Sequence, residues 1–179
     1  YIETLTFKQT ADGHFTVTAR FLGKFETSVA KPTPTFSTQA IFIPPQGALT
    51  LGGVSNVKMY DLTLTQKRNT IMIPGIGQQQ PQSGLAGFME VTAAMIFGVQ
   101  DATEYNYFLN NTQPVFSQLF TSGTNTLTLQ MSKFAFEDPT ERRFNKENLE
   151  VAASARAIYN ATDGGPIKQI WVNPRSTNY

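Results

Sequence analysis

Hydrophobic and polar residues alternate over long stretches of this chain, which is the pattern of β-strands whose two faces meet different surroundings. Between residues 88 and 159 the alternation predicts three long strands, the second from Thr126 to Met131 and the third from Leu149 to Tyr159. The first of them has an apolar face made of Met89, Val91, Ala93, Met95 and Phe97. The segment shows no chemistry, and its two-faced strands are suited to building a wall.

A short helix is predicted after the first of these strands, with Asp101 as its N-cap and Tyr105, Phe108 and Leu109 at helical spacing. We interpret Asp101 and Glu104 as residues that stabilise the positive end of the helix, rather than as an acid pair for hydrolysis. We expect the helix to cover the apolar face of the sheet.

The rest of the pattern predicts a hairpin from Glu3 to Lys24, with its turn at 11–13, and later strands at 57–65 and 167–172. Residues 113–120 are predicted to form a helical turn, and a bend near Ser132 is needed to explain a change of parity at Phe134. Segments 26–39 and 67–87 are predicted to be irregular, except that the apolar patch Ile71-Met72-Ile73 could pair as an edge.

These elements predict a mainly β fold with about eight or nine strands. Two packed antiparallel sheets, in a β-sandwich or barrel, carry one short α-helix. A chain of 179 residues is expected to form a single domain over 1–179.

The composition suggests a surface that meets other subunits. Charged residues make up 15% of the chain, against about 25% in ordinary soluble domains. The formal net charge of +1 does not indicate non-specific attraction to nucleic acid or to a membrane surface. Since no run of about 18 apolar residues occurs, no transmembrane helix is predicted.

Candidates for catalysis or metal binding are few. The chain has no cysteine and a single histidine, His14, which we interpret as an exposed polar residue beside the hairpin turn. Gly75-Ile76-Gly77 does not fit a phosphate-binding loop. The charged segment 137–148 is either a solvated loop or an interface element. We therefore expect no catalytic residue, no metal and no cofactor.

The order of these elements resembles that of the tail tube (major tail) proteins of long-tailed bacteriophages, whose fold is shared by the ring protein of the type VI secretion system. The resemblance covers nearly the whole chain. It is carried by the segments Ile2–Thr6, Phe15–Lys24, Ala30–Phe36, Val57–Asn69, Glu90–Ala93 and Glu104–Leu109.

The resemblance implies a structural virion protein, assembled in the host cytoplasm into hexameric rings that stack into a tube. The inner wall is a continuous β-barrel, and DNA passes through it during ejection. Other implied partners are the tape measure, tail terminator and distal tail proteins, with no membrane partner. Family members usually carry sequence before the first hairpin, so the resemblance implies either that an N-terminal portion is missing here or that the chain is a shorter relative.

Two sets of site residues follow from the resemblance and the strand parity. Strands apolar on one face and polar on the other suit a wall with a packed side and a wet lumen. The lumen-facing candidates are Thr16, Thr18, Glu90, Thr92, Glu150 and Ser154. The candidates for contact between stacked rings lie in the loop 26–39 and are Lys31, Pro32, Pro34 and Phe36.

The alternative is a β-sandwich binding module for carbohydrate or a receptor. Its signature would be aromatic side chains exposed together on one strand face, and here Trp171 and most Phe residues fall on positions with core parity. An enzyme is disfavoured because acid, base and nucleophile candidates do not converge.

Overall fold

A computed structural model of the chain describes most of its length. The described residues are 1–23, 33, 42–43, 46–55, 58–77, 80–98, 103–137, 141–145 and 148–173.

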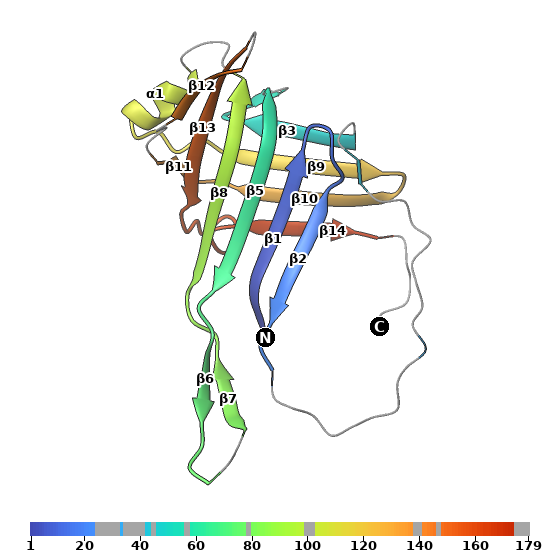
Figure 1. Cartoon of the computed structure of the whole chain (residues 1–179), viewed down its shortest axis with the longest axis vertical. Coiled ribbons are helices and arrows are strands. Elements are labelled where there is room, and N and C mark those ends of the chain that lie inside the picture. Colours follow the sequence, from blue (N-terminus) through green and yellow to red (C-terminus); the bar gives the residue numbers. More distant parts are fainter. Residues whose placement is uncertain are drawn as a thin grey trace.

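Two antiparallel sheets pack against each other, and the larger one lies in front in Figure 1. It contains seven strands in the order β11-β13-β8-β5-β1-β2, with β12 paired to β13 beside β11. The bounds of these strands are β1 Ile2–Thr10, β2 Thr16–Phe21, β5 Met59–Arg68, β8 Met89–Gly98, β11 Phe134–Phe136, β12 Glu141–Asn145 and β13 Asn148–Ala157.

The second sheet has five strands in the order β14-β10-β9-β3-β4, and they run across the strands of the larger sheet (Figure 1). Its strands are β3 Gly47–Leu51, β4 Val54–Ser55, β9 Phe116–Ser122, β10 Asn125–Met131 and β14 Lys168–Val172. A two-stranded hairpin of β6 (Ile71–Pro74) and β7 (Pro81–Leu85) projects below the larger sheet. The prediction of a mainly β fold with two packed antiparallel sheets and one short helix is confirmed.

The core lies between the two sheets and is rich in phenylalanine. Phe120 on β9 is fully buried, and its ring centroid lies 4.3 Å from that of Phe15 and 5.7 Å from that of Phe42. Further along β9, the ring of Phe116 lies 5.0 Å from that of Phe134 on the larger sheet. These ring contacts join the sheets because each strand turns every second side chain inward.

Two glutamine pairs also connect the sheets. The Gln118 side-chain amide donates to the Gln9 amide oxygen at 2.9 Å, and the Gln169 amide donates to that of Gln66 at 2.6 Å. Polar groups in or beside a core are costly unless they are hydrogen-bonded, and here each pair satisfies itself across the interface.

The predicted helix exists as α1 (Thr103–Leu109), but the expectation that it covers the apolar face of the sheet is wrong. It lies at the edge of the larger sheet, where Tyr107 stacks on Phe136 with ring centroids 6.0 Å apart. Seven residues of helix span about 10 Å, whereas a ten-residue strand spans about 33 Å. The second sheet, not the helix, buries Val91, Ala93, Met95 and Phe97.

The helical turn predicted at 113–120 is also wrong, because β9 occupies most of this segment. Phe116 and Phe120 are four residues apart, a spacing that fits either a helix or a strand. Pairing with β10 and β3 decides for the strand. Phe116, Gln118 and Phe120 therefore turn inward, while Leu119 is partly exposed.

The bend predicted near Ser132 is confirmed, and it carries the chain from β10 in the second sheet to β11 in the larger one. The Asp163 carboxylate holds this crossing by accepting hydrogen bonds from the Ser132 N–H at 2.7 Å and the Ser132 hydroxyl at 2.8 Å.

The strand count is higher than predicted, with fourteen strands in the described part of the chain. The pairing expected at 71–73 is confirmed by β6, whereas β7 in the same segment and β12 in the charged segment 137–148 were not predicted. Both are short pairings that a hydrophobic pattern hardly marks. Within the described residues, no helix is long and apolar enough to cross a membrane.

Replacing Phe120 with Ala tests the packing between the sheets. We expect Phe120→Ala to lower the free energy of unfolding by about 3–5 kcal/mol, because it empties a fully buried ring position. Leu119→Ala, one residue away and 38% exposed, is the matched control and should cost less than about 1 kcal/mol. Urea unfolding of the unassembled subunit measures both, and equal losses would contradict this account of the core.

Candidate functional site

The face of the larger sheet that points away from the second sheet is the candidate site, and we call it the polar face. It is formed by alternate residues of β2, β1, β5, β8 and β13. Across these five strands the antiparallel register places one residue of each directly beside the next. One such row consists of Thr18, Thr6, Thr65, Thr92 and Arg156.

We call the four threonines of this row the threonine row. At about 4.8 Å between strands, the full row of five residues extends about 19 Å from Thr18 to Arg156. The neighbouring row on one side consists of Thr16, Lys8, Thr63, Ala94 and Ser154. The row on the other side consists of Arg20, Thr4, Lys67 and Glu90.

The six residues predicted to share a functional face all lie on the polar face. Thr16 and Thr18 come from β2, Glu90 and Thr92 from β8, and Glu150 and Ser154 from β13. All six side chains are exposed or partly exposed. Opposite them on the same strands, the inward residues Val91, Ala93, Met95, Ala153 and Ala155 are buried.

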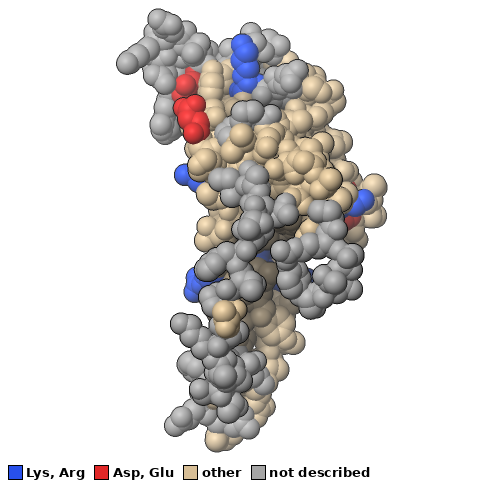
Figure 2. Space-filling view, turned by 90° about the vertical axis from the view of Figure 1, so that its right-hand side faces the viewer, with Lys and Arg blue, Asp and Glu red and all other residues tan. Residues whose placement is uncertain are grey.

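Charges on the polar face are balanced among the side chains that the structure describes. The cations are Lys8, Arg20, Lys67 and Arg156, and the anions are Asp61, Glu90, Glu137 and Glu150, with Glu3 beside Arg20. Uncharged side chains also dominate the described surface seen in Figure 2, where Lys and Arg or Asp and Glu form small separate groups.

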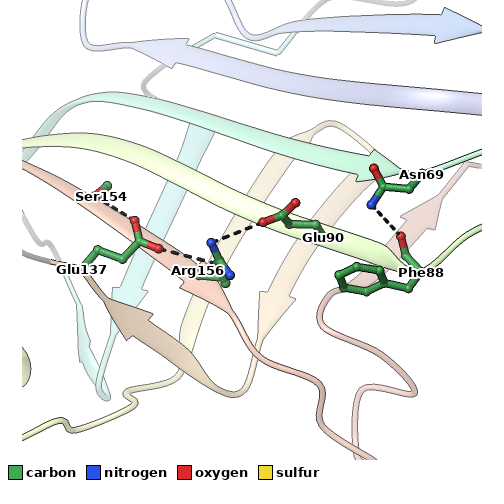
Figure 3. A network of polar contacts seen from close by, with 6 residues as sticks. All are labelled: Asn69, Phe88, Glu90, Glu137, Ser154 and Arg156. Atoms are coloured by element: carbon green, nitrogen blue, oxygen red, sulfur yellow. Dashed lines mark hydrogen bonds and ion pairs between the residues drawn. The ribbon is translucent and has the colours of Figure 1, made fainter.

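Two of these cations are held by carboxylates. Arg20 Nε lies 2.8 Å from a Glu3 carboxylate oxygen. Arg156 contacts two carboxylates, with Nη2 at 3.3 Å from Glu90 and Nε at 3.5 Å from Glu137 (Figure 3). The Ser154 hydroxyl donates to the second oxygen of Glu137 at 3.2 Å.

Figure 3 also shows where the polar face gives way to the β6–β7 hairpin. There the Asn69 amide donates to the Phe88 carbonyl oxygen at 3.4 Å, between the end of β5 and the start of β8. The face is thus a surface of small polar residues and paired charges.

A comparison with protein families decides the identity. A family model described as phage tail tube protein matches residues 2–169. The chain belongs to the phage tail tube family. It is a non-enzymatic structural protein, a component of the virion tail that self-assembles there. Comparison with curated proteins gives no match.

The sequence-based set missed part of the polar face of this tail tube protein. Thr6 and Thr65 complete the threonine row, and the alternation of Thr with Leu or Phe along β1 and β5 was the signal that marks them. Arg156 has the same parity as Ser154 on β13. An arginine without aromatic neighbours in sequence does not stand out until its carboxylate partners are seen.

The other candidates have mixed outcomes. Lys31, Pro32, Pro34 and Phe36 lie outside the described residues of this tail tube protein, so their role between rings stays a prediction. His14 is exposed beside the hairpin turn, as interpreted. Within the described part of the chain, no group of three or more metal-ligating side chains occurs.

Trp171 lies on the strand face predicted for core residues, but its side chain is not buried. Its partner across the ladder is Leu127, which is fully buried, yet Trp171 itself is 56% exposed because β14 is the edge strand of the second sheet. Phe21 on β2 is exposed for a similar reason, at the opposite edge of the larger sheet from β11 and β12. Exposure at sheet edges is expected where neighbouring copies meet a tail tube subunit.

Proposed function

We propose that this tail tube protein forms hexameric rings that stack into a tube, with the polar face lining a lumen through which DNA passes. One observation carries the proposal: a contiguous polar face spans five strands, while the second sheet packs against the opposite face. In this arrangement the larger sheet is the inner wall and the second sheet lies outside it, with residues 1–179 acting as one tail tube domain.

Ring closure accounts for the edges of the larger sheet. All six residues of β2 are exposed at one edge, and β11 and β12 form the other. An open edge presents unpaired backbone groups that favour association with another strand. Pairing β2 of one copy with the β11–β12 edge of the next is a head-to-tail contact, and repeated contacts of this kind close into a ring.

The dimensions of the sheet fit a duplex passing through such a ring. With β11 and β12 sharing one position, six strands at about 4.8 Å each contribute about 29 Å of circumference per copy, so a hexamer has a backbone diameter of about 55 Å before strand tilt widens it. This leaves room for a DNA duplex after side chains are added.

The chemistry of the polar face favours passage over binding. Protein–DNA affinity depends mainly on Lys and Arg that neutralise phosphates. On the polar face the threonine row presents hydroxyls, and described cations are matched by described anions. Such a wall interacts weakly with each phosphate and allows the polyanion to slide.

Contacts between copies are supported by exposed apolar side chains away from the polar face. Val17 and Phe21 are exposed on β2, and Ile71, Ile73 and Leu85 are exposed on the projecting hairpin. Apolar groups of this size on a projecting element mark interaction sites. The loop 26–39 is proposed to contact the adjacent ring. The tape measure protein is proposed to occupy the lumen, and the terminator and distal tail proteins to bind the two ends.

Single cysteines test the placement of the polar face, since the natural chain has none. We expect Thr92→Cys in assembled tubes to react with a small maleimide but to resist a maleimide carrying a long polyethylene glycol chain, because the thiol faces an enclosed lumen. In unassembled subunits both reagents should react.

Thr128→Cys, on the outer face of the second sheet, is the matched control and should react with both reagents in tubes and in subunits. Gel shifts measure the labelled fraction. If Thr92→Cys in intact tubes accepts the bulky reagent as fast as Thr128→Cys, the polar face does not line the lumen.

Replacing loop 26–39 with a Gly-Ser segment tests its role between rings. We expect subunits that unfold at the same urea concentration as the natural protein but no longer form long tubes, because the flanking strands β2 and β3 pair within their own sheets. Electron microscopy and sedimentation measure assembly. Tubes of normal length from this variant would exclude the role.

A further inference from the structure

Arg156 lies beside Thr92 at the end of the threonine row, as the one charged residue in the row of five that starts at Thr18. Its side chain is 55% exposed on the polar face. A guanidinium in this place is well suited to bind a phosphate, because it offers several donors in a fixed plane. On a surface over which DNA slides, a free arginine would be a point of retention.

The two carboxylates reach Arg156 from different strands. Glu90 comes from β8, next to β13, and Glu137 directly follows β11 on the other side (Figure 3). They engage Nη2 and Nε, respectively, the two nitrogens that form the side edge of the guanidinium. Glu137 is itself fixed, because its N–H donates to the Ser154 carbonyl oxygen at 2.8 Å and its carboxylate accepts from the Ser154 hydroxyl.

Fold stability does not account for this cluster. Its ion pairs are 3.3 and 3.5 Å long and lie between partly exposed groups, and such pairs contribute little to folding. The cluster does have a clear electrostatic result. Two carboxylates beside one guanidinium offset its positive charge, which weakens its attraction for a phosphate.

We propose that Glu90 and Glu137 mask Arg156, so that DNA phosphates crossing the polar face meet no free guanidinium. The inference rests on the proposed function in one respect, namely that DNA crosses this face. It assigns a role to three residues, with Ser154 positioning Glu137. Lys67, the cross-strand partner of Glu90, is a further cation in the adjacent position of the polar face.

Removing the two negative charges should expose Arg156 to DNA. The test uses the unassembled full chain, on which the polar face is accessible, and a short duplex DNA of random sequence as the probe. Binding is followed by fluorescence anisotropy between about 50 and 200 mM salt. For the double variant Glu90→Gln/Glu137→Gln we expect tighter binding, with the slope of log K against log salt steeper by about one unit.

Two triple variants distinguish an effect of Arg156 from an effect of net charge alone. Adding Arg156→Gln should abolish the increase in slope produced by the double variant. Adding Lys8→Gln, which removes the same charge from the adjacent row, should leave the increase intact. The masking role is overturned if the double variant shows no increase in slope. It is also overturned if Arg156→Gln and Lys8→Gln reduce that increase equally.

A measurement on assembled tails separates this inference from the proposed function. DNA release from particles with Glu90→Gln/Glu137→Gln tubes should be slower than from natural particles, and Arg156→Gln should restore it. If the subunits show the Arg156-dependent increase in slope while release is unchanged, masking is supported and the placement of the polar face in the lumen is rejected.

Discussion

The packing of the second sheet against one face of the larger sheet is the interaction on which the rest of the structure depends. Phe120, Phe116 and Leu127 enter this interface fully buried, and each contributes about 1.5–3 kcal/mol of burial free energy. A sheet covered on one face has its other face available for function. Because side chains alternate, the same residues that build the core also determine which threonines and charges lie on the polar face.

This constraint also fixes the register of the polar face. A slip of one residue between two strands would move apolar groups such as Leu64 and Val91 outward and place Thr65 and Thr92 in the core. The core therefore penalises every misalignment across the five strands. The threonine row remains continuous for that reason, without requiring any attraction between its own members.

The alternation along β8 and β13 was enough to predict that Thr92 and Ser154 share a face, because a period of two is a local property. What covers the apolar face was not predictable in the same way. It depends on Ser132, where the chain changes sheet, and on the pairing of β9 with β3, which is distant in sequence.

The candidate site shows the same division between local and long-range information. Phe116 and Phe120 fit two periodicities, and only pairing with β10 and β3 selects the strand. Arg156 forms ion pairs with Glu90 and Glu137, which reach it from a neighbouring strand and from the end of β11. Sequence spacing does not predict such contacts, because they exist only once three separate segments have come together.

The measurement that tests the central claim most directly is a density map of assembled tubes at a resolution that traces strands. The account predicts a hexameric ring whose innermost layer is the larger sheet, with the threonine row facing the lumen and the second sheet at a larger radius. A map in which the second sheet or helix α1 lines the lumen, with the threonine row packed against protein, would contradict it.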